Sequence, residues 1–176
     1  MLFLTCPVRA QYGGGTGEPN DPYLIYTAEQ MNTIGTESND WDKHFKLMAD
    51  IDLGGYTGTD FNIIGKGLLP AFTGVFEGNG HTISNFTYSS TGEPCIGIFG
   101  YIDGPDARIS NLGLIDPNVD GGTGVGVGPL AGWIDMGTIT NCYVAGGNVT
   151  GKQQVGGLIG TCAGVITDCY AVGGAS

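Results

Sequence analysis

An internal repeat is the feature that most constrains the fold of this chain. Four segments, residues 74–86, 97–112, 129–142 and 157–169, share one frame: a Gly or Pro, two apolar residues, a turn, and then a short apolar and polar run. The repeated positions are a column of isoleucines, a polar column two residues later, and an apolar column after that: Ile83, Ile109, Ile139 and Ile166; Asn85, Asn111, Asn141 and Asp168; Phe86, Leu112, Cys142 and Cys169. A period of this size is typical of solenoid proteins.

The repeat unit favours short strands over helices. Its apolar pieces are brief and are bounded by Gly, Asn or Asp, and the chain holds 34 glycines, each of which weakens a helix. We therefore expect an all-β parallel β-solenoid, in which successive coils stack about 4.8 Å apart. The isoleucines should form one inward stack and the polar residues a ladder at a corner. Cys142 and Cys169 are then small core residues, with a disulfide between stacked coils as the alternative.

The apolar turn segments resemble those of the GLUG-motif repeat proteins. The motif stands as GLIG at residues 157–160, with PLAG at 129–132 and GIFG at 97–100 as variants, and the similarity extends over residues 18–176. The glycines that frame it are Gly97, Gly100, Gly132, Gly157 and Gly160. The resemblance implies a right-handed parallel β-helix of the kind found in bacterial adhesin-like surface proteins and some large secreted peptidases. It implies no catalytic residues.

Three segments follow from this frame. Residues 1–10 are apolar and fit the remnant of a signal peptide, residues 11–44 an N-terminal cap with a short helix, and residues 45–176 the repeats. Thr27 and Gln30 form a capping box at the start of the helix, and Gly35 is suited to its end. The C-terminus carries no such covering element. We expect the repeats to be incomplete there, so that they continue in further repeats or stack on another chain.

Charge and hydropathy exclude two classes of partner. The net charge is −11 with six Lys and Arg, which excludes the clustered basic residues that nucleic acid requires. Glycine interrupts every apolar run before it reaches the length of a membrane span, so no membrane span is expected. The apolar N-terminus favours export, and with it an extracellular or cell-surface location.

Metal and cofactor signals are weak. Asp116, Asn118 and Asp120 match the first ligand positions of a calcium loop, but Val127 stands where a bidentate Glu belongs, which favours a turn over a calcium site. Asp50 and Asp52 are predicted to share one face of a strand, and there a solvated acidic face is the preferred interpretation. We expect no other cofactor.

No residue is assigned a catalytic role. The basic residues that a β-helix polysaccharide lyase would use, Lys43, Lys46, Lys66, Arg108 and Lys152, show no shared repeat position. Glu77 with Asp103 or Asp106 is the carboxyl pair considered for a glycosidase. His44 and His81 lie in no recognised motif.

The sequence therefore predicts a non-catalytic, exported structural or adhesive β-solenoid module of a longer bacterial protein, with an extracellular glycan or a surface protein as partner. Aromatic residues offer rings that stack on sugars or on one another: Tyr88, Tyr101, Trp133, Tyr143 and Tyr170. The alternatives are a β-helix polysaccharide lyase or glycoside hydrolase, and an accessory repeat region of a secreted peptidase.

Overall fold

The computed structural model describes residues 11–175. The predicted signal-peptide remnant, residues 1–10, lies outside the described residues. Within the described part of the chain, no helix is both long and apolar enough to cross a membrane.

Strands make up most of the regular secondary structure in the described chain. They are joined by one α-helix, α1 (Ala28–Ile34), and one 3₁₀ turn, η1 (Ser38–Asp40). The strands are β1 (Tyr23–Ile25), β2 (His44–Leu47), β3 (Ile51–Asp52), β4 (Val75–Glu77), β5 (Thr82–Ser84), β6 (Thr87–Ser89), β7 (Phe99–Ser110), β8 (Gly113–Ile115), β9 (Asn118–Asp120), β10 (Val125–Val127), β11 (Ala131–Thr140), β12 (Tyr143–Thr150), β13 (Gln153–Val155), β14 (Ile159–Cys162), β15 (Val165–Thr167) and β16 (Tyr170–Ala175).

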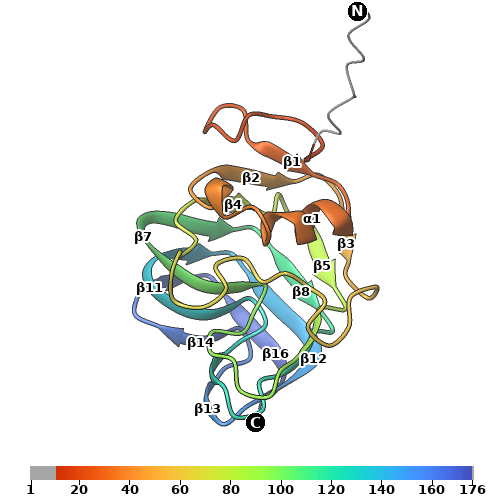
Figure 1. Cartoon of the computed structure of the whole chain (residues 1–176), viewed down its shortest axis with the longest axis vertical. Coiled ribbons are helices and arrows are strands. Elements are labelled where there is room, and N and C mark those ends of the chain that lie inside the picture. The colour runs from red at the N-terminus through yellow and green to blue at the C-terminus, as the bar shows by residue number, and fades with distance from the viewer. Residues whose placement is uncertain (1–10, 176) are drawn as a thin grey trace, which may run out of the picture.

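These strands form three sheets whose ladders are all parallel. The first sheet has the order β1-β2-β4-β7-β11-β14, with β15 also paired to β11. The second has the order β3-β5-β8-β12-β9-β6, with β16 paired to β12, and the third joins β10 to β13. The coils follow one another down the long axis of the molecule (Figure 1). The predicted parallel β-solenoid with a short helix is confirmed.

The register of the first sheet stacks three of the four repeat isoleucines. Ile109, Ile139 and Ile166 are direct partners on β7, β11 and β15, and Phe76 on β4 precedes them. Ile83 does not belong to this stack, because it lies in the second sheet between Ile51 and Leu114. The prediction of one four-isoleucine column is therefore wrong at its first member.

The polar column is divided in the same way. Asn111, Asn141 and Asp168 form one corner, between the first and second sheets, with φ values of 55°, 52° and 54°. Asn141 Nδ2 donates to Asn111 Oδ1 at 2.7 Å, and Asn111 Nδ2 donates to Glu77 Oε1 at 2.9 Å. The left-handed backbone of these residues suits Asn and Asp, whose short polar side chains bond locally.

Asn85 has the same backbone conformation, with φ of 57°, but it turns a different corner. Its Nδ2 donates to Asp52 Oδ1 at 2.9 Å, and its N–H donates to the carbonyl of Ile115. Phe86 accordingly lies apart from the column that contains Leu112. The two corners use the same local chemistry, which is why one sequence frame covered both.

Cys142 and Cys169 are neighbours in adjacent coils. Both are free thiols, Cys142 is buried and Cys169 is half-buried. The N–H of Cys142 donates to Cys169 Sγ at 3.4 Å, and burial raises the pKa of the Cys142 thiol to about 12. A thiol with this pKa is a poor nucleophile at neutral pH, consistent with a packing role.

The helix α1 has the predicted cap. Thr27 Oγ1 accepts from the N–H of Gln30 at 3.2 Å, while Gln30 Oε1 accepts from Tyr26, one residue earlier than a standard capping box. Met31 and Ile34 are fully buried. The parallel sheet begins within the segment predicted as a cap, because β1 pairs with β2. The boundary at residue 45 is thus placed too late.

Candidate ligand-binding groove

The side of the solenoid carries a groove formed by three chain segments. Two adjoining hollows of about 350 and 410 Å³ share Asp42, Thr73 and Asp103. Residues 38–44 form one wall, residues 69–75 the second, and residues 103–106 the third. The insertion between β3 and β4 supplies the second wall and exposes Leu69, which is 83% accessible.

An irregularity in the first sheet positions the acidic wall. The register between β7 and β11 shifts on both sides of the pair formed by Asp103 and Met136. The chain therefore bulges at Gly104, where an added Cβ would lie 3.2 Å from Thr73. The bulge leaves Pro105 and Asp106 exposed beside the groove.

Asp103 is part of a polar cluster that links two coils. The hydroxyl of Tyr101 lies 3.4 Å from Oδ2 of Asp103 and 3.4 Å from Oδ2 of Asp135. Burial, followed by the charges of the two carboxylates, raises the pKa of Tyr101 to about 12. Asp103 Oδ1 is buried and has no hydrogen-bond partner among the described residues. Trp133, half-buried, is the register partner of Tyr101.

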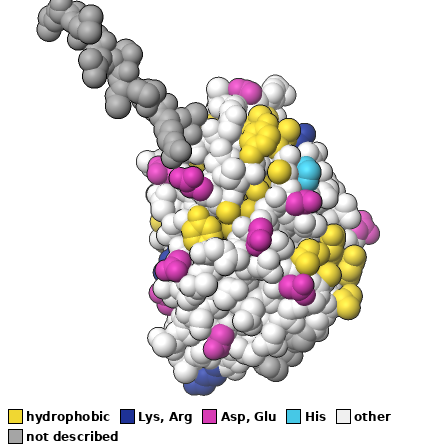
Figure 2. Space-filling view, turned by 90° about the vertical axis from the view of Figure 1, so that its right-hand side faces the viewer, with side chains coloured by type: hydrophobic (Ala, Val, Ile, Leu, Met, Phe, Trp, Pro, Cys, Tyr) yellow, Lys and Arg dark blue, Asp and Glu magenta, His cyan; other side chains and the backbone are white. Residues whose placement is uncertain are grey.

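This arrangement suits an uncharged ligand that donates hydrogen bonds. The carboxylates of Asp42, Asp103 and Asp106 are acceptors, and their charges disfavour anions. On the face in Figure 2, Asp and Glu side chains are spread over the surface. Among residues 11–175, no group of three or more His, Cys, Asp or Glu side chains is placed to hold a metal ion.

The residues considered for calcium are used in turns. Asn118 and Asp120 lie on β9, and Asp116, with φ of 48°, turns the corner before it. Asp120 Oδ1 accepts from the N–H of Gly122 at 3.0 Å and from Thr150 Oγ1 at 2.9 Å. These bonds lower the pKa of Asp120.

Asp50 and Asp52 have a similar structural use. Asp50 Oδ1 accepts from the N–H of Thr82 at 2.9 Å and lies 3.2 Å from His81 Nδ1. Asp52 Oδ1 accepts from the N–H of Gly54 at 2.9 Å as well as from Asn85. Both carboxylates thus bond neighbouring coils or turns.

Glu77 is separate from the groove carboxyls in its contacts. Its Oε2 accepts from Ser110 Oγ at 2.8 Å and its Oε1 from the N–H of Asn79 at 2.7 Å, at the head of the corner ladder. The carboxyl that shares a hydrogen-bond partner with Asp103 is Asp135, which the sequence patterns did not single out. A signal was present in the repeat alignment. Residues 101–103 (YID) align with residues 133–135 (WID), which would have placed Asp103 and Asp135 together.

The basic residues are divided between ion pairs and the outer face of the first sheet. Lys43 pairs with Asp42 and Lys66 with Glu93, each at 3.2 Å. Lys46 is the register partner of Glu77, and Arg108 that of Val75. Lys46 and Arg108 therefore share one sheet, although they do not occupy equivalent positions. Lys152 is exposed near the start of β13.

The aromatic residues fall into three environments. Tyr143 and Tyr170 stack with ring centroids 5.3 Å apart and planes within 9°, as the mutual-stacking alternative expects. Tyr88 is 1% exposed and its hydroxyl donates to Glu93 at 2.9 Å, so it offers no surface ring. Tyr101 and Trp133 are half-buried beside the groove carboxyls.

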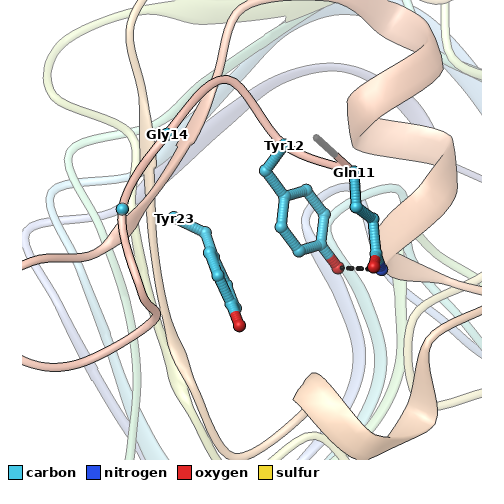
Figure 3. A pocket seen from close by; sticks show the side chains of 5 residues that line it. Gln11, Tyr12, Gly14 and Tyr23 are labelled. Atoms are coloured by element: carbon cyan, nitrogen blue, oxygen red, sulfur yellow. Dashed lines mark hydrogen bonds between the residues drawn. The ribbon is translucent and has the colours of Figure 1, made fainter. Parts of the chain in front are cut away.

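A smaller hollow of about 270 Å³ lies at the N-terminal end, between Gln11, Tyr12, Gly14 and Tyr23 (Figure 3). Two of its polar side chains already bond within the protein. Gln11 Nε2 donates to the Tyr12 hydroxyl at 3.2 Å, and that hydroxyl donates to Asp40 Oδ2 at 3.1 Å. This hollow is part of the closure of that end.

Comparisons with known proteins find similarity to parts of larger proteins. No family model matches the chain. It is 36% identical over 152 residues to halomucin from Haloquadratum walsbyi, covering 83% of this chain and 2% of halomucin. It is 35% identical over 106 residues to a protein from Evansella cellulosilytica named "Putative Gly-rich membrane protein", covering 58% of this chain and 12% of that one.

A crystal structure of a "putative immunoglobulin A1 protease" from Bacteroides ovatus shares the fold. The TM-score is 0.71 at 23% identity, over 93% of this chain and half of the other. At this identity the likeness concerns the fold alone. The chain thus spans a small part of its sequence relatives and half of the solved structure.

Proposed function

We propose that this chain is a non-catalytic GLUG-type β-solenoid module of a longer exported protein, and that its groove binds a neutral glycan at the cell surface or outside the cell. Similarity to halomucin and to a glycine-rich membrane protein, each matched over a small fraction of its length, supports a modular role. Three sheets of parallel strands make a stiff support on which a surface groove keeps its shape.

The observation that carries the proposal is the cluster of Tyr101, Asp103 and Asp135 beside the groove. Sugar hydroxyls donate to carboxylates, and the groove is lined by those of Asp42, Asp103 and Asp106. Aromatic rings next to such acceptors are suited to the apolar faces of sugars. The net charge of −11 favours a neutral glycan over an acidic one.

One observation favours a glycoside hydrolase as the second candidate. The two Oδ2 atoms that contact the Tyr101 hydroxyl are at most about 7 Å apart, an upper limit that is compatible with the carboxyl pairs of glycosidases. Of the lysines and arginines among residues 11–175, only Lys43 lies in a wall of the groove, and it pairs with Asp42. The fold shared with a protease-like protein leaves the accessory region of a secreted peptidase as a third candidate.

The test is binding of the wild-type chain to a panel of neutral and acidic polysaccharides by affinity electrophoresis. We expect retention by a neutral polysaccharide, with affinity lowered about tenfold by Asp103→Asn because one charged acceptor is lost. Asp168→Asn makes the same charge change at an exposed corner and should leave retention unchanged. Retention by no neutral polysaccharide, or equal losses in both variants, would overturn the proposal.

The same panel separates binding from hydrolysis. Release of reducing ends by the wild type, abolished by Asp135→Asn as well as by Asp103→Asn, would replace the adhesive function with a glycoside hydrolase. Retention without release of reducing ends supports the adhesive module.

A further inference from the structure

A third hollow adjoins the groove on the same side of the solenoid. It has a volume of about 340 Å³ and shares His44 and Val75 with the 410 Å³ hollow of the groove. Its other lining residues come from β2, β4 and the segment before β1: Pro19, Pro22, Phe45, Lys46 and Glu77. Each hollow therefore shares part of its lining with the next, and the groove continues into the third hollow.

The three hollows follow the strands along the outer face of the first sheet. Side chains two residues apart on a strand share a face, and Phe45, Phe76 and Ile109 on the opposite face are buried in the core. Two rows of register partners cross β2, β4 and β7 on the outer face: His44, Val75 and Arg108, followed by Lys46, Glu77 and Ser110. The groove reaches the first row and the third hollow reaches the second. The third hollow thus extends the depression by about 7 Å along the strands.

The third hollow offers a hydrogen-bond donor where the groove offers acceptors. The ammonium of Lys46 forms no hydrogen bond or ion pair among residues 11–175, whereas Lys43 and Lys66 are paired. Glu77 does not neutralise it, because the two carboxylate oxygens of Glu77 already accept from Ser110 and from the N–H of Asn79. Pro19 and Pro22 add apolar rings on the other side of the hollow.

We infer that the groove and the third hollow together bind one linear neutral glycan chain, long enough to cross the row of His44 and Val75. Sugar hydroxyls donate to the groove carboxylates at one end, and sugar oxygens accept from Lys46 at the other. This inference rests on the proposed function, because it takes the groove as a glycan site, and it adds the length of the ligand.

A short and a long ligand differ in what they gain from this surface. A disaccharide in the groove leaves the third hollow empty. A longer chain adds the contacts of the third hollow, while the translational and rotational freedom of only one molecule is lost. The affinity should therefore rise with chain length, and the part that rises should depend on Lys46.

The test uses oligosaccharides of two and six residues, prepared by partial hydrolysis of the neutral polysaccharide that the wild-type chain retains. Isothermal titration calorimetry measures their affinities. We expect the hexasaccharide to bind the wild type about tenfold more tightly than the disaccharide. Lys46→Ala should weaken the hexasaccharide about fivefold and leave the disaccharide unchanged. Lys152→Ala makes the same charge change at an exposed residue outside the three hollows and should change neither affinity.

The outcomes separate this inference from the proposed function. Equal affinities of the two oligosaccharides for the wild type would overturn the inference and leave the groove as a site for a short glycan. An unchanged hexasaccharide affinity in Lys46→Ala would overturn it as well, as would equal losses for both oligosaccharides. Retention of no neutral polysaccharide would overturn the proposed function, and the inference with it.

Discussion

The two ends of the solenoid solve the same problem in opposite ways. At the N-terminal end, residues 12–14 pair with the edge of β1, and the ring of Tyr12 packs 4.5 Å from that of Tyr23 at the end of the core. At the C-terminal end, β14, β15 and β16 have no strand on their outer side among residues 11–175, and Ile166, Tyr170 and Val172 are 46%, 57% and 64% exposed. The comparison teaches that equivalent residues of a repeat contribute differently to the free energy of unfolding. The contribution of each residue depends on whether another coil covers it.

The largest expected effect compares two residues of one column. Ile139→Ala removes a fully buried side chain with coils on both sides and should lower the free energy of unfolding by about 3 kcal/mol. Ile166→Ala removes the same atoms from the end coil, where the side chain is 46% exposed, and should cost about 1 kcal/mol. Urea titration of both variants measures the difference. Equal losses for the two variants would show that the last coil, residues 153–175, is covered in solution.

The next effect concerns the polar corner. Asn111→Ala removes hydrogen bonds to Glu77 and Asn141 and places alanine at φ of 55°, so we expect a loss of about 2 kcal/mol in the free energy of unfolding. Asp168→Ala imposes the same backbone strain at the open end and should cost about 1 kcal/mol. Thermal or urea unfolding checks both, with Asn111→Gly as the control that removes the bonds without the strain. A loss for Asp168→Ala as large as that for Asn111→Ala would contradict the ladder as the cause.

The solenoid architecture followed from the sequence because its physical cause is periodic. Short apolar runs between Gly, Asn and Asp exclude long helices, and matching isoleucines at Ile109, Ile139 and Ile166 require stacked coils. The error at Ile83 has an equally physical cause. The runs TISNF at residues 82–86 and RISNL at 108–112 both end a strand at an Asn with positive φ, but they turn different corners. Local chemistry thus identified a corner without saying which one.

The groove was harder to foresee because non-repeating elements build it. The insertion between β3 and β4 and the bulge at Gly104 bring Thr73 next to the β7 wall, and neither follows the repeat period. Asp103 was considered with Glu77, whereas its partner through Tyr101 is Asp135. The closure by Tyr12 depends on a single aromatic residue outside the repeats, which carries no periodic signal.

The smallest expected effect is a loss of stability in acid that differs between coils. Backbone and side-chain hydrogen bonds lower the pKa values of Asp50, Asp52 and Asp120 below the usual value near 3.9. A carboxyl whose folded pKa is lowered contributes stability that is present above its unfolded pKa and is lost as the pH falls through its folded pKa. Stability should therefore decline as the pH drops below about 4, and amides that bond these carboxylates, such as those of Thr82 and Gly122, should lose protection first.

The last coil offers the contrast for this experiment. Residues 153–175 show no carboxylate that is hydrogen-bonded across a turn among their described contacts. Hydrogen exchange at pH 5 and pH 3, corrected for the intrinsic rate at each pH, should change at Gly122 and stay level in β15. Asp120→Asn should make the exchange of Gly122 insensitive to pH in this window, because the amide oxygen accepts the same bond without titrating. If β15 loses as much protection as Gly122, acid unfolds the solenoid as one unit. The coils at the two ends would then open together rather than independently.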